Sequence, residues 1–244
     1  MPTVTIVGGG VVGLGTAMLL AKAGHKVTVL ERDPDPPYDE AGDNWESWQR
    51  RGVTQFRLPH YFLACFRHVL ETELPEVAKA LEDAGALRYN VVAAVPEQLR
   101  GQWRPDDDRY AVLTARRPVA EAMLASVAER TPGVELRRGV AVTGLATGPS
   151  AHVGTPHVVG VVTADGEELR SDLVVDVSDR PVGPAPLARR HRRPAAGRGG
   201  RRLGFHVLQP AFPLRRRVGA CRPGASAQPH RHHQHPRPGL GTSG

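Results

Sequence analysis

The alternation of apolar and polar positions organises the first part of the chain most clearly. Residues 3–7 form a short apolar run that predicts a buried strand, and a glycine-rich turn follows at once. Small and apolar residues over 14–23 predict a helix, and residues 26–30 predict a second strand that ends at Glu31. Strand, turn, helix and strand in this order are typical of a βαβ unit in a parallel sheet.

Helices and strands continue to alternate after this unit. Residues 33–60 are rich in proline and polar residues and are expected to be irregular. The helical spacing of apolar residues, with Pro75 as a helix start and Gly85 as a stop, predicts two helices between residues 62 and 85. The remaining predicted elements are a strand over 88–95, a strand over 110–113, a helix after Thr114, and strands over 134–145, 158–163 and 173–177. The pattern therefore predicts an α/β fold on a parallel sheet.

The turn after the first strand has the G-x-G-x-x-G spacing of a Rossmann-like dinucleotide-binding unit. Gly8 permits a tight turn, Gly10 lets a pyrophosphate approach the backbone, and Gly13 lets helix and strand pack closely. Val11 and Val12 lie just before the predicted helix, whose N-terminus offers N–H groups and a positive dipole end to the phosphates. We expect these residues to contact a pyrophosphate.

Glu31 completes the pattern, 18 residues after Gly13. At the end of the second strand a carboxylate can accept hydrogen bonds from a ribose. The spacing serves both flavin and nicotinamide dinucleotides, and a glycine-rich turn without a ligand is the alternative. The sequence therefore predicts a dinucleotide site and leaves the nucleotide open.

Charge divides the chain into two unlike parts. Residues 1–179 carry 18 Lys and Arg against 25 Asp and Glu, a net charge of −7. Residues 180–244 carry 14 Arg and no acid, a net charge of +14, together with 10 Pro and 6 His. Such a tail cannot bury enough apolar surface to offset the entropy of ordering it, so we expect disorder there.

A basic tail raises two further possibilities. Residues 230–235 could be a histidine-rich metal tract, but the surrounding arginines oppose a cation and no scaffold is indicated, so no metal site is predicted. A chain of this charge would bind nucleic acid by neutralising phosphates, weakly and without sequence preference. We therefore expect no specific nucleic-acid partner.

Cysteine usage and hydropathy indicate a compartment. Cys65 and Cys221 form no disulfide framework or metal-spaced cluster, which suits a reducing cytoplasm. Cys65 lies among aromatic and apolar residues and is expected in the core. There is no apolar run of membrane-spanning length and no basic segment before the first strand, so neither a membrane span nor a signal peptide is expected.

Four segments, in order, resemble the FAD-dependent oxidoreductases of the aromatic-hydroxylase type, the class A flavoprotein monooxygenases. The resemblance rests on residues 6–33, on 50–60 (RRGVTQFRLPH), on 114–119 (TARRPV) and on 172–178 (DLVVDVS). It implies bound FAD, reduction of the flavin by NAD(P)H, and oxygen transfer to a small organic substrate.

The resemblance also implies contacts to the cofactor. By motif position Arg51 and Arg117 would contact FAD, with Arg116 as a one-residue alternative, and Arg32 would flank the adenine. His60 could lie near the flavin ring, although a lone His after a proline is more often structural. The resemblance identifies no catalytic residue, and nothing indicates an oligomeric state.

The resemblance ends at Ser178. Residues 1–178 are therefore expected to be a partial FAD-binding domain, and residues 179–244 a disordered or frameshift-derived tail. Reading residues 204–213 one base later, with suitable codons, gives ASTYYSRHFR, which resembles a downstream segment of the same family. Two alternatives remain: an NAD(P)-binding dehydrogenase fragment, and an inactive remnant whose basic tail binds nucleic acid nonspecifically.

Overall fold

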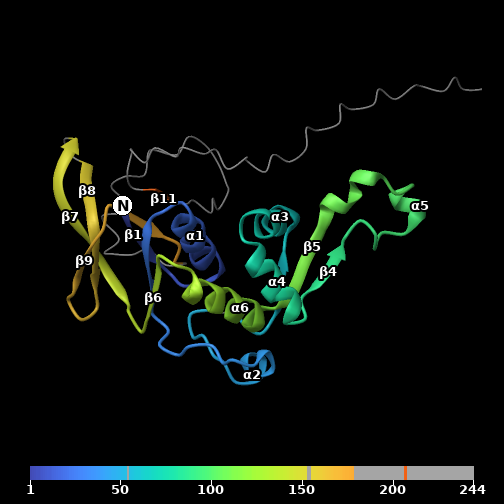
Figure 1. Ribbon diagram of the computed structural model, residues 1–244, viewed down its shortest axis with the longest axis horizontal. Coiled ribbons are helices and arrows are strands. Elements are labelled where there is room, and N and C mark those ends of the chain that lie inside the picture. The colour runs from blue at the N-terminus through green and yellow to red at the C-terminus, as the bar shows by residue number, and fades with distance from the viewer. Residues whose placement is uncertain (54, 153–154, 179–205, 208–244) are drawn as a thin grey trace, which may run out of the picture. The chain divides into compact units, whose positions relative to one another are not determined.

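The computed structural model describes residues 1–53, 55–152, 155–178 and 206–207, and all of these belong to one unit spanning residues 1–212 (Figure 1). The expected disorder and the frameshift interpretation of residues 179–244 lie outside the described residues, apart from two positions. His206 and Val207 form a short strand, which differs from the expectation of a tail without structure.

The unit spanning residues 1–212 contains a five-stranded sheet. Its strands, in spatial order, are β11 (His206–Val207), β10 (Leu173–Asp176), β1 (Thr3–Val7), β2 (Lys26–Glu31) and β6 (Val134–Arg138). The four strands from β10 to β6 are parallel, and β11 pairs antiparallel with β10. Four of the five residues of β1 are buried, as expected for a strand inside a parallel sheet. The predicted α/β fold on a parallel sheet is confirmed.

Two antiparallel sheets extend this architecture. One has the order β3 (Pro59–Phe62), β5 (Ala111–Arg116) and β4 (Leu87–Asn90). The other has the order β7 (Val142–His152), β8 (Thr155–Thr163) and β9 (Glu168–Arg170). Both occur between β2 and β10 in the sequence, so they are excursions from the parallel sheet.

Helices provide the main core. They are α1 (Val11–Lys22), α2 (Ala41–Glu46), α3 (Ala64–Glu73), α4 (Pro75–Asp83), α5 (Glu97–Arg100) and α6 (Arg117–Arg130), with a 3-10 helix η1 (Pro105–Tyr110). Side chains of α1, α3, α4 and α6 interlock around Leu14, Leu70, Leu81 and Leu124, all at most 1% exposed. This core fixes α6 beside α1, and so brings the beginning of α6 toward the glycine-rich turn.

Two predicted strands differ from the structure. The expected strand over 134–145 is two strands in different sheets, because Gly139 adopts a φ of +73° and turns the chain between them. The expected strand over 88–95 ends at Asn90, whose side-chain oxygen accepts the Val92 N–H at 2.9 Å and so replaces the ladder by a turn.

Segment 33–60 and Cys65 also depart from expectation. The irregular segment contains α2 and the start of β3. Cys65 is exposed rather than in the core, because α3 buries Arg67 and Leu70 on its inner face and turns position 65 outward. Apolar neighbours in sequence lie on different faces of a helix, so local composition did not predict its burial.

Candidate dinucleotide site

The glycine-rich turn connects the end of β1 to the start of α1. Gly8 has a φ of +110°, a conformation that favours glycine, and its N–H donates to the Leu30 carbonyl at 2.9 Å. The turn is thereby tied to the end of β2. It therefore lies at the carboxyl edge of the parallel sheet, where open α/β folds bind their ligands.

Gly10 and Gly13 have different surroundings in this turn. A Cβ on Gly13 would lie 1.9 Å from the Gly8 carbonyl oxygen, so α1 approaches the turn too closely for any side chain there. A Cβ on Gly10 would meet no atom of the described residues within 4 Å. The space beside Gly10 is therefore open, as a phosphate approaching the backbone would require.

The start of α1 is suited to an anion. Its first turn carries no acidic residue, and the first N–H groups of any helix lack partners within the helix. Val11 is buried beside the core, whereas Val12 is 45% exposed. The helix dipole adds partial positive charge at this end, so the electrostatics favour a phosphate.

Glu31 is buried at the end of β2 and is fixed by several donors. Its Oε2 accepts the Gly9 N–H at 2.8 Å, its Oε1 accepts the Asp33 N–H at 3.0 Å, and Arg50 donates to Oε2. Burial alone would raise the pKa of Glu31, but the charge of Arg50 and the hydrogen bonds lower it below the ordinary value. Glu31 is therefore a charged acceptor, directly bonded to the glycine-rich turn.

Arg50 is the centre of a buried cluster of charges. Its guanidinium pairs with Glu31 and Glu121 and, at 3.2 Å, with Asp33, and it donates to the Gly9 carbonyl at 3.3 Å. Its pKa is raised above the ordinary value: burial opposes the charge, but Glu121 and Glu31 outweigh that effect. We call Glu31, Asp33, Arg50, Arg117 and Glu121 the carboxylate–arginine cluster.

Arg117 joins this cluster from α6. Its Nε donates to Glu121 Oε1 at 2.7 Å, and its N–H donates to the Leu58 carbonyl at 3.3 Å. Sequence reasoning selected Arg117 but missed Arg50 and Glu121. The i,i+4 spacing of Arg117 and Glu121 was a signal for their pairing, whereas nothing local distinguished Arg50 from Arg51.

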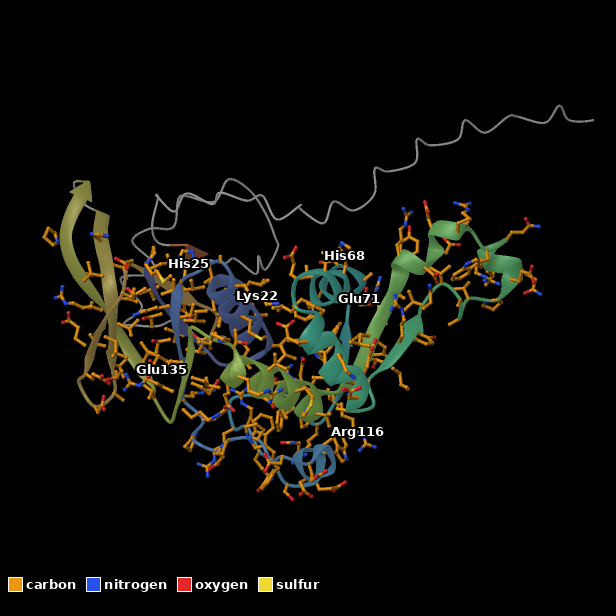
Figure 2. The ribbon with its side chains drawn as sticks, viewed as in Figure 1. Lys22, His25, His68, Glu71, Arg116 and Glu135 are labelled. Atoms are coloured by element: carbon orange, nitrogen blue, oxygen red, sulfur yellow. The ribbon has the colours of Figure 1, made fainter. Side chains whose placement is uncertain are left out.

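The other selected arginines lie outside the cluster. Arg51 is exposed in a turn, and Arg32 is exposed with its guanidinium against the backbone of Gly52. Arg116, labelled in Figure 2, lies where β5 meets α6. Its guanidinium is 4.6 Å from the ring centroid of Trp45 on α2. A cofactor contact of Arg32 or Arg51 remains a prediction.

His60 lies near the cluster on β3. Burial lowers its pKa, and the neighbouring charge of Arg117 lowers it further, with Glu121 acting in the opposite direction. Its ring packs edge-on against Phe62 with centroids 4.9 Å apart. This environment keeps the imidazole neutral near pH 7.

Known proteins match the segment that contains the turn and Glu31. The FAD dependent oxidoreductase family matches residues 3–49. This part of the chain is similar to that family. The glycine-rich turn, α1 and Glu31 all lie within it, so the family match and the site geometry concern the same residues.

Two bacterial relatives are similar to this chain over a short stretch. A D-amino acid dehydrogenase of Agrobacterium fabrum is 68% identical over 31 residues, which are 13% of this chain and 7% of that protein. The D-amino acid dehydrogenase 2 of Ralstonia nicotianae is 54% identical over 33 residues, which are 14% of this chain and 8% of that protein. The aligned stretch thus spans less than a tenth of these curated relatives.

Solved structures are similar over a longer part of the chain. The Diels-Alderase PyrE3 of pyrroindomycin biosynthesis covers 72% of this chain and 32% of its own, at 23% identity and a TM-score of 0.48. PqsL, a probable FAD-dependent monooxygenase from Pseudomonas aeruginosa, covers 71% and 41%, at 16% identity and a TM-score of 0.46. The tetrameric form of 2-methyl-3-hydroxypyridine-5-carboxylic acid oxygenase covers 71% and 38%, at 17% identity and a TM-score of 0.43.

Two features are absent from the described residues. No helix among them is long and apolar enough to cross a membrane. No group of three or more His, Cys, Asp and Glu side chains in the same part of the chain could hold a metal ion. The histidine-rich tract over 230–235 lies outside the described residues.

Proposed function

We propose that this chain binds FAD through the adenosine diphosphate half of the cofactor and forms the N-terminal part of an oxidoreductase. The observation that carries the proposal is the tie between the glycine-rich turn and a buried, charged Glu31 through the Gly9 N–H at 2.8 Å. This bond supports the proposal because it holds the proposed ribose acceptor beside the proposed phosphate-binding turn at one edge of the sheet. The open space beside Gly10 fits a pyrophosphate.

Each residue of the site has a proposed role. Gly8, Gly10, Val11, Val12 and Gly13 would hold the pyrophosphate through their backbone, and Glu31 would accept a ribose hydroxyl. Arg32 would lie beside the adenine, and Arg51 and Arg117 would contact FAD. The Arg117 side chain is 20% exposed and so is not closed off from solvent.

The proposed reaction is a hydroxylation. When bound, FAD would supply the redox chemistry, with NAD(P)H as reductant and a small organic substrate as oxygen acceptor. The residues of this chain would bind and orient the cofactor and exclude water from its phosphates. Residues 1–178 would then be a partial FAD-binding domain, with the rest of the enzyme's activity depending on sequence that this part does not contain.

A pair of valine substitutions tests the binding site. We would titrate the full 244-residue chain with FAD and follow flavin fluorescence. In Gly10→Val the new side chain would occupy the space through which the pyrophosphate approaches the backbone. FAD binding should weaken at least tenfold, because the loss of one hydrogen bond to a charged phosphate, about 1.5–3 kcal/mol, corresponds to that factor or more. Gly42→Val is the matched control, because a Cβ there also meets open space but lies on α2, away from the turn.

Three results would decide the proposal. Selective loss of FAD binding in Gly10→Val, with unchanged urea midpoints in both variants, supports it. Equal FAD affinity in both variants would place FAD elsewhere. Binding of NADH and not of FAD by the unsubstituted chain would favour the dehydrogenase alternative, since the G-x-G-x-x-G turn serves both cofactors.

A further inference from the structure

The carboxylate–arginine cluster is more elaborate than binding a ribose requires. Three carboxylates and two guanidinium groups meet there, and the side chains of Glu31, Arg50 and Glu121 are at most 5% exposed. Buried ion pairs lose much of their attraction to desolvation, and apolar replacements are often at least as stable. Stability alone therefore does not account for the cluster.

The hydrogen bonds of Glu31 leave it one place for a ligand. An ionised carboxylate offers about four acceptor positions, two on each oxygen. Among the described residues Oε2 accepts from Gly9 and from Arg50, which fills its two positions. From the same part of the chain, Oε1 accepts only the Asp33 N–H at 3.0 Å, which leaves one position on Oε1 without a donor among the described residues.

Arg50 in turn is held from three sides. Glu121 on α6 pairs with its Nη1, and Asp33 pairs with its Nε at 3.2 Å. The Gly9 carbonyl accepts from Nη1 at 3.3 Å, so the same arginine contacts both the glycine-rich turn and Glu31. A planar guanidinium with these partners has little freedom to rotate.

We propose that Arg50 is a positioning residue, which locks Glu31 so that only Oε1 accepts a single hydroxyl of the adenosine ribose. Glu121 and Asp33 fix Arg50 in this role. The inference rests on the proposed function, because it concerns the same nucleotide site. It adds a selectivity: one of the two ribose hydroxyls is recognised and the other is not.

Two monodeoxy nucleotides test this selectivity directly. We would measure the dissociation constants of ADP, 2′-deoxy-ADP and 3′-deoxy-ADP for the full chain by calorimetry. ADP should bind at least tenfold more tightly than one deoxy analogue, because a hydrogen bond to a charged group is then lost. The other analogue should bind within about twofold of ADP, a difference well below one such bond.

Substitution of Arg50 should remove the difference between the analogues. In Arg50→Met all three nucleotides should bind alike, at the level of the weaker analogue, because Glu31 is then no longer fixed. Arg50→Lys should retain part of the discrimination between the analogues, since an ammonium group keeps the positive charge but lacks the planar, forked donors of a guanidinium. The matched control is Arg88→Met, which removes an exposed pair with Glu71 at 2.8 Å and should discriminate as the unsubstituted chain does.

The outcomes separate this inference from the proposed function. Unchanged discrimination in Arg50→Met overturns the role of Arg50 while nucleotide binding stands. Equal binding of all three nucleotides by the unsubstituted chain overturns the single-hydroxyl selectivity. Failure of that chain to bind either ADP or FAD overturns the proposed function itself. If Arg50→Met does not fold, Arg50→Lys and Glu121→Gln decide by the same ratio of dissociation constants.

Discussion

Gly13→Ala should destabilise the protein although alanine is the better helix former. A Cβ at this position would lie 1.9 Å from the Gly8 carbonyl oxygen and 3.1 Å from Val177 Cγ2. Contacts of real Cβ atoms with backbone do not fall below 3.0 Å, so α1 must move away from the turn by about 1 Å. The movement would reach the core packed on α1.

Gly15→Ala supplies the matched comparison on the same helix. A Cβ there meets no described atom within 4 Å. Alanine gains about 1 kcal/mol over glycine in a helix interior, and overpacking costs about 1–3 kcal/mol. With the cost at Gly13 at the upper end of that range, Gly15→Ala should gain about 1 kcal/mol and Gly13→Ala should lose about 2 kcal/mol.

Urea unfolding measures this difference of about 3 kcal/mol, expected from the same two effects. Tryptophan fluorescence is a suitable signal because Trp48 is buried. Thermal midpoints should differ in the same direction, by about 2–4 °C for each kcal/mol in a chain of this size. Equal free energies of unfolding for the two variants would refute the close approach of α1 to the turn.

Three further predictions concern the core and the charged cluster. Leu124→Ala should cost about 2–5 kcal/mol in urea unfolding, against less than about 0.5 kcal/mol for the exposed Leu99→Ala, and similar losses would contradict the assigned core. The pKa of His60 is lowered in the native state, so as the pH falls the unfolded chain binds a proton at this histidine before the native chain does. The contribution of His60 to stability should therefore be fully present only above pH 6.5 and should decrease as the pH falls toward its folded pKa. His60→Gln should reduce the dependence of the urea midpoint on pH between about pH 7 and pH 5. An unchanged pH dependence would exclude this histidine as its cause. Glu121→Leu should cost about 3 kcal/mol because it removes a partner from the buried Arg50 and from the half-buried Arg117. Glu129→Leu should have little effect, because the Glu129 side chain is 46% exposed in its pair with Arg138.

Local patterns in the sequence determined the nucleotide-binding unit. The apolar run over 3–7, the spacing of Gly8, Gly10 and Gly13, and the acid at Glu31 each act within a few residues, and strand, turn and helix follow from such short-range preferences. A parallel sheet was predicted from the alternation of strands and helices, but the order of its strands was not. The family match to residues 3–49 covers the same segment.

Only the tertiary structure decided which charged residues meet. Glu121 lies 71 residues after Arg50, and the two come together because the core between α1 and α6 sets the position of α6. Arg50 and Arg51 are neighbours with the same side chain, yet one is buried among carboxylates and the other is exposed. Burial and partner choice depend on long-range packing, and a sequence pattern carries no such information for two adjacent arginines.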